Sequence, residues 1–135
     1  MAKQQRVWMR VRQLSRQEKE EIAAACQRFI DEHLKPRFLS EIRPTEFNYP
    51  VDLDGRWRGR SYSFFTRYRS GFPENLGEEF DAPLARLDHV EEKVDRVLFD
   101  VMWPRHTGRF WPLLMGATLE AAFAFIEKDG LLWPM

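Results

Sequence analysis

The chain has 135 residues, 44% hydrophobic and 31% charged, with 21 lysines and arginines against 21 aspartates and glutamates, which suits one globular domain and excludes disorder driven by net charge. Its single cysteine excludes an internal disulfide. No apolar run reaches the roughly 20 residues of a membrane span, so we expect a cytoplasmic protein without a membrane partner.

The zero net charge conceals a segregation along the chain. Residues 35–73 carry eight basic and four acidic side chains, whereas residues 74–102 carry three basic and nine acidic ones. We expect these blocks to form surfaces of opposite charge that meet within the fold or between copies.

Residues 1–14 are expected to form a basic arm or a strand, because Val7, Met9 and Val11 alternate with bulky and charged side chains. A helix is then predicted to begin after Ser15, which with Glu18 has the spacing of a capping box.

The helix has one apolar stripe and is predicted to end at Lys35, because Pro36 disfavours helical geometry in the residue before it. The stripe contains Ile22, Cys26, Phe29, Ile30, His33 and Leu34.

Period-2 alternation and turn residues then predict an antiparallel meander of about five strands. Two turns compete for the first hairpin, Asp54-Gly55 and Arg58-Gly59, and we prefer the second because it leaves longer alternating strands. An acidic loop, residues 73–82, separates the second strand from the third. The predicted strands are residues 51–57, 60–69, 84–90, 96–103 and 109–115.

A second helix is predicted to begin at Thr118 and to stop at Asp129-Gly130, before an apolar tail that folds back on the core. The sequence therefore predicts a single α+β domain over residues 1–135, with the two helices packed on one face of the sheet.

The second face of this sheet carries more apolar residues than a water-facing sheet usually does. They are Phe65, Leu98, Trp111, Leu113 and Met115. A second copy of the chain, a ligand groove or the 73–82 loop would account for them.

The first hairpin combines aromatic and arginine side chains, which together can bind phosphates and stack on unpaired bases. The candidate residues for an anionic partner are Arg56, Trp57, Arg58, Arg60, Arg67 and Arg69. We favour the alternative in which Tyr62, Phe64 and Tyr68 are core and the arginines pair with the acidic block 74–102, because the net charge is balanced and no RNA-recognition signature is present.

The segment 104–109 offers a second candidate site. His106, flanked by Arg105 and Arg109, could serve as a general acid or base or bind an anion. The alternative, which we favour, is an ordinary hairpin turn. The histidines and Cys26 have no metal-ligand spacing, and we expect neither a metal nor another cofactor.

The segments ARLDHV, VLFDVMWPRHTGRFWPL and LEAAFAFIEKDGLLWPM resemble a family of small uncharacterised bacterial proteins, a domain of unknown function. The resemblance covers residues 15–135 in the order of elements, and it rests on Ala85 to Leu87, the aromatic strand pair, Asp129 and Trp133. It implies the helix, meander and helix order, and it implies no activity.

We therefore expect a non-catalytic binding or assembly protein that forms a homodimer through the exposed sheet face. The alternative is a nucleic-acid or anionic-ligand binder that uses the hairpin 56–69, and of these partners nucleic acid is not favoured. A third hypothesis is an enzyme with a small acid and base site at His106.

Overall fold

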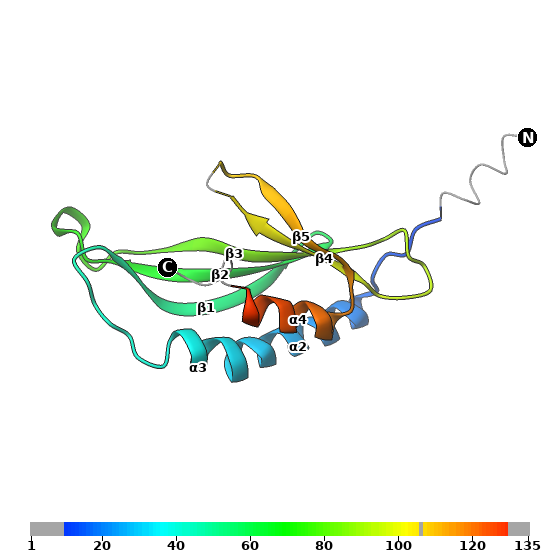
Figure 1. Ribbon diagram of the computed structural model, residues 1–135, viewed down its shortest axis with the longest axis horizontal. Helices are drawn as coiled ribbons and strands as arrows, with labels where there is room; N and C mark the ends of the chain where they lie inside the picture. The colour runs from blue at the N-terminus through cyan, green and yellow to red at the C-terminus, as the bar shows by residue number, and fades with distance from the viewer. Residues whose placement is uncertain (1–9, 106, 130–135) are drawn as a thin grey trace, which may run out of the picture.

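The computed structural model describes residues 10–105 and 107–129, which form a sheet and a layer of helices on one of its faces (Figure 1). The helical layer contains α2 (Arg16–Phe29), a π-helical turn (Ile30–Leu34), α3 (Lys35–Phe38) and α4 (Leu119–Lys128). The sheet contains β1 (Asn48–Arg58), β2 (Ser61–Ser70), β3 (Glu79–His89), β4 (Phe99–Pro104) and β5 (Phe110–Ala117), with a 3-10 turn (Pro73–Asn75) between β2 and β3.

The strands pair in chain order, each antiparallel to the next. This order confirms the predicted α+β class and the five-strand meander, with one helical segment before it and one after it. Among the described residues, no helix is long and apolar enough to cross a membrane.

The start of α2 is the predicted capping box. The Ser15 hydroxyl accepts a hydrogen bond from the Glu18 amide at 3.1 Å, and the Glu18 carboxylate accepts one from the Ser15 amide at 2.9 Å. These contacts lower the pKa of the Glu18 carboxyl, the bond from the Ser15 amide being the largest cause and the nearby Arg12 guanidinium adding to it.

The prediction that Pro36 ends this helix at Lys35 is wrong. A π-helical turn precedes Pro36, and the chain continues helically to Phe38 with the proline in the first turn of α3. A first-turn residue needs no N–H for an intrahelical bond, so the proline is tolerated there.

The core lies between the helices and one face of the sheet. Phe29 of α2 stacks on Phe123 of α4 with ring centroids 4.3 Å apart, and it meets Phe64 of β2 edge-on at 6.3 Å. Tyr62 and Phe64, both predicted to face the core, are 2% and 1% exposed. Burying such a ring stabilises the folded state by about 1.5–3 kcal/mol. Through these contacts the aromatic cluster joins α2 and α4 to the sheet.

The first hairpin turns at Gly59 and Arg60, which confirms the preference over a turn at Asp54-Gly55 and places the turn one residue later than predicted. Gly59 has a φ of 62°, a conformation that glycine adopts without strain. Gly55 instead lies within β1 beneath the ring of Tyr62, and a Cβ at this position would be 2.5 Å from Cε1 of that ring.

Several boundaries differ from those predicted. The strand β1 begins at Asn48, three residues before the predicted start, and β4 begins at Phe99 rather than at residue 96. The predicted loop 73–82 ends earlier, because β3 begins at Glu79 and its first acidic residues face arginines of β2.

The predicted N-terminal strand falls largely on residues 1–9, and the predicted apolar tail on 131–135; both ranges lie outside the described residues. From residue 10 to the start of α2 the chain is not part of the sheet, although the Arg12 amide donates to the Glu91 carbonyl at 2.8 Å.

Candidate anion-binding groove

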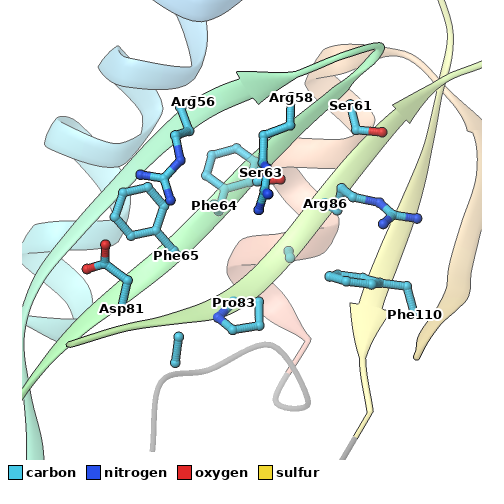
Figure 2. A pocket seen from close by; sticks show the side chains of 12 residues that line it. Arg56, Arg58, Ser61, Ser63, Phe64, Phe65, Asp81, Pro83, Arg86 and Phe110 are labelled. Atoms are coloured by element: carbon cyan, nitrogen blue, oxygen red, sulfur yellow. The ribbon is translucent and has the colours of Figure 1, made fainter. Parts of the chain in front are cut away.

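The open face of the sheet, opposite the helices, is hollowed into a groove of about 340 Å³. Strands β1, β2 and β3 supply most of its lining, and β5 supplies Phe110 (Figure 2). Its charged lining residues are Arg56, Arg58, Arg86 and Asp81. The groove is therefore a basic hollow on the open face of the sheet, at the first hairpin.

Two arginines of the groove stack on phenyl rings. The Arg56 guanidinium lies 4.4 Å from the centroid of Phe65, and that of Arg86 lies 4.1 Å from the centroid of Phe110. A guanidinium stacked in this way keeps its N–H groups along its edge, where they can bind a phosphate or carboxylate with two parallel bonds. Stacking therefore positions these cations without using their donors.

Two other arginines of the hairpin are neutralised by acidic residues directly across from them on β3. Arg67 Nε lies 3.1 Å from Asp81 Oδ1, and Arg69 Nη2 lies 2.7 Å from Glu79 Oε2. The hydrogen bonds to these carboxylates raise the pKa of each arginine. For these two side chains, pairing with the acidic block 74–102 is confirmed.

Arg86 is also paired, within its own strand. Its Nε and Nη2 donate to the two carboxylate oxygens of Asp88 at 2.6 Å and 2.9 Å, and Ser61 Oγ donates to the same carboxylate at 2.7 Å. Asp88 is 9% exposed. The carboxylate is thus largely shielded from water, whereas the Arg86 side chain is 29% exposed, and the pair fixes Arg86 against Phe110.

Arg56 and Arg58 differ from these three arginines. Both are exposed, and neither forms an ion pair with a carboxylate in the part of the chain that the structure describes. The acid that shares the groove with them, Asp81, is bonded to Arg67. Arg56 and Arg58 are therefore the groove cations that no carboxylate among the described residues neutralises.

Trp57 and Arg60, also predicted to bind an anion, lie outside the groove. The Trp57 indole N–H donates to the Lys19 carbonyl at 2.9 Å, and its ring meets Tyr62 edge-on, so it belongs to the helix side of the sheet. Successive side chains of a strand point to opposite faces, so Trp57 lies on the other face of β1 from Arg56 and Arg58. Arg60 lies in the turn and donates to the His89 carbonyl.

The second candidate site, between β4 and β5, forms the expected hairpin turn. The Arg105 amide donates to the Arg109 carbonyl at 2.8 Å, and the Arg105 guanidinium lies 4.9 Å from the ring of Trp111. Arg109 is exposed. His106 lies outside the described residues, so its suggested role in acid and base chemistry stays a prediction.

The five residues predicted to form an apolar interface do not share one exposed face. Phe65 lies on the open face but is 7% exposed beneath Arg56, and Leu98 is 6% exposed. Leu113 packs against the main core. Only Trp111 and Met115 of the five are well exposed, at 49% and 68%.

The pairing of β5 with β4 is irregular at these positions. The cross-strand partners shift twice, between Phe99 and Val101 and again between Val101 and Met102. Trp111 is consequently opposite Trp103, a residue that packs against the core, so it faces the helix side. Each inserted residue reverses the face of the side chains beyond it, so simple alternation does not assign the faces of β5.

Cys26 and His33 give no further site. Cys26 is fully buried, and burial raises the pKa of its thiol to about 12. His33 is exposed, with Nδ1 3.7 Å from the Glu127 carboxylate. Among residues 10–105 and 107–129, no group of three histidine, cysteine, aspartate or glutamate side chains could hold a metal ion.

Sequence reasoning did not select Arg86, Ser61 or Phe110 as site residues. Alternation along β3 could have found Arg86, because it places this side chain and Asp88 on the face opposite Leu87. Phe110 could not have been found in this way, because its approach to Arg86 depends on how β4 and β5 are aligned.

Fold and groove together define a small α+β protein whose sheet is covered by helices on one face and bears an arginine-lined hollow on the other. The chain belongs to the family described as Domain of unknown function (DUF3024), which matches residues 14–134. The predicted resemblance to an uncharacterised domain family is therefore confirmed, and its bacterial origin stays a prediction. Comparison with curated proteins and with solved structures gave no match.

Proposed function

We propose that the protein binds a small anionic ligand in the groove on the open face of the sheet. One observation carries this proposal. Arg67, Arg69 and Arg86 each have a carboxylate partner, whereas Arg56 and Arg58, on the rim of the groove, have none among the described residues. Two exposed cations beside a concave, partly apolar surface are suited to bind a phosphate or carboxylate.

The shape of the groove favours a small ligand over a nucleic-acid strand. A volume of about 340 Å³ lies at the lower end of the range for small-molecule sites. Phe65 is covered by Arg56, so its face is not open for stacking with a base. The ligand that fits is an anion with a flat or apolar body, which lies against Phe110 and Pro83 while Arg56 and Arg58 bind its charge.

Thermal unfolding with a panel of mononucleotides, sugar phosphates and aromatic carboxylates would test the proposal. A ligand at one hundred times its Kd stabilises the folded state by about 2.7 kcal/mol, which is a clear shift in Tm. The shift should shrink as salt is added, because salt screens the charges of exposed groups.

Two double variants separate the groove from general charge effects. Arg56→Gln with Arg58→Gln should abolish the shift, whereas Arg28→Gln with Arg96→Gln, which removes the same charge from exposed positions elsewhere, should preserve it. Equal losses in both variants would contradict the proposal. A response to single-stranded DNA or RNA alone would support the nucleic-acid alternative instead.

Self-association is a second candidate function, and of the predicted interface residues only those on β5 support it. This strand is an edge of the sheet and exposes Trp111 and Met115. Light scattering after gel filtration should show a dimer that Trp111→Ser with Met115→Ser converts to a monomer. A wild-type chain that is monomeric at high concentration would eliminate this candidate.

A further inference from the structure

Ser63 of β2 lies in the middle of the groove lining. Its cross-strand partners are Arg56 on β1 and Arg86 on β3, so these three side chains form one row across the open face. Residues directly opposite each other in antiparallel strands have Cβ atoms about 4.5–5.5 Å apart. Figure 2 shows Ser63 between the arginines of β1 and Arg86. A ligand that binds Arg56 and Arg58 is therefore close to the Ser63 hydroxyl.

The Ser63 hydroxyl forms no side-chain hydrogen bond in the part of the chain that the structure describes, unlike those of the other two serines of β2. Ser61 Oγ donates to the Asp88 carboxylate at 2.7 Å, and Ser70 Oγ donates to the Asn75 side-chain oxygen at 2.6 Å. Ser63 is half-buried, so a ligand that covers it displaces water and has to replace the hydrogen bond that the water made. The hydroxyl therefore favours a ligand with an acceptor oxygen above it.

The unpaired charge of the groove suits a dianion. Arg56 and Arg58 contribute one positive charge each, because neither pairs with a carboxylate among the described residues. The other charged residues of the lining, Arg86 and Asp81, each have a partner of opposite charge. A ligand with a single negative charge would leave one of the two arginines without a counter-charge.

The groups that remain to bind an anion approach it from different directions. Arg56 is stacked on Phe65, so its N–H groups point outward along the edge of the guanidinium. Arg58 lies two residues further along β1 on the same face, and Ser63 donates from the neighbouring strand. A carboxylate presents two oxygens in one plane. A phosphate monoester presents three terminal oxygens in different directions and carries a charge of about −1.5 to −2 at pH 7, so it matches both the donors and the charge.

We propose that the ligand of the groove is a phosphate monoester, with Arg56 and Arg58 binding its phosphate and the Ser63 hydroxyl donating to one of its terminal oxygens. This inference rests on the proposed function and specifies the class of its ligand. The body of the ester then lies against Phe110 and Pro83. Ser63 is a binding residue in this assignment and takes no part in making or breaking a bond.

Calorimetric titration with three ligands that share a phenyl body tests the assignment, slightly above neutral pH and at constant ionic strength. Phenyl phosphate is then a dianion with three terminal oxygens. Phenyl sulfate keeps the three oxygens with a single charge, and phenylacetate has two oxygens and a single charge. Phenyl phosphate should bind about tenfold more tightly than either of the others, as expected for one further hydrogen bond to a charged group or one further paired arginine. Equal affinity for phenyl phosphate and either of the other ligands would overturn the inference.

Variants of the serine assign the contact. Ser63→Ala should weaken phenyl phosphate binding about tenfold, whereas Ser63→Thr should keep most of the affinity because it keeps the hydroxyl. Ser40→Ala, at an exposed position before β1, is the matched control and should bind like the wild type. The Ser63 hydroxyl bonds to no described residue, so the Tm of free Ser63→Ala should equal that of the wild type, which separates loss of binding from loss of structure.

The inference and the proposed function can fail separately. If Ser63→Ala binds phenyl phosphate as tightly as the wild type while the Arg56→Gln and Arg58→Gln variant does not bind it, the role of Ser63 is overturned and the proposed function stands. If the wild type binds none of the anions tested, both are overturned.

Discussion

Replacing Asp88 with asparagine removes the charge that holds Arg86 in place. Asp88 is 9% exposed and accepts bonds from Arg86 at 2.6 Å and 2.9 Å and from Ser61 at 2.7 Å. A hydrogen bond to a charged group contributes about 1.5–3 kcal/mol. Asparagine keeps the shape and an acceptor for Ser61, so we expect the free energy of unfolding to fall by about 2 kcal/mol and Tm by about 7 °C.

Urea unfolding followed by tryptophan fluorescence would measure the loss, with Glu41→Gln as the matched control. Glu41 pairs with Arg43 at 3.0 Å, but these side chains are 67% and 78% exposed, so the control should change stability by less than about 0.5 kcal/mol. An Asp88→Asn protein as stable as the control would show that water screens the groove pair as fully as the surface pair, and would refute the reasoning.

The same substitution has a second expected effect, opposite in direction. Once Asp88 is neutral, the Arg86 guanidinium becomes a third cation in the groove without a carboxylate partner among the described residues. The less stable protein should therefore bind its anionic ligand severalfold more tightly than the wild type in calorimetric titration. Weaker binding would mean that ligand binding depends more on the position in which Asp88 holds Arg86 than on an unpaired positive charge.

Three further predictions concern Gly55, Cys26 and His89. Gly55→Ala should lower the free energy of unfolding by about 1–3 kcal/mol, because the new methyl group meets the buried Tyr62 ring; unchanged stability in urea would show that the ring can move. Cys26, whose pKa burial raises to about 12, should react with a thiol reagent only as fast as the protein opens, and immediate labelling of the native protein would contradict this. Burial lowers the pKa of His89 on folding, so the imidazole of the unfolded chain is protonated at a higher pH than that of the folded protein. The free energy of unfolding should therefore decline as pH falls below about 6.5, and it should decline less steeply in His89→Gln. Equal slopes of stability against pH in the two proteins would contradict the lowered pKa.

Local rules predicted the parts of the fold that depend on local interactions. The Ser15 and Glu18 capping box uses groups three residues apart, and the alternation of Tyr62 and Phe64 follows from the pleat of a single strand. The π-helical turn before Pro36 was not predictable, because no local sequence rule signals the wider hydrogen-bond pattern in which the Lys35 N–H donates to the Ile30 carbonyl.

The candidate site depended on long-range alignment and was predicted only in outline. The hairpin contained the arginines, but which of them have partners follows from the register of β2 against β3, which places Arg67 opposite Asp81. The interface prediction assumed unbroken alternation along β5, whereas its pairing with β4 shifts register twice and places Trp111 opposite Trp103. A single sequence has no signal that fixes such a shift in advance.

The stack of Phe29 on Phe123 also bears on how the molecule is made. It joins α2, which leaves the ribosome before any strand, to α4, which leaves it after all five. During synthesis the apolar side of α2 therefore stays exposed or bound by a chaperone until the meander and α4 have been added. A nascent chain stalled before α4 would present that surface to the cell, so protection of α2 from protease should appear late in translation, together with the final helix.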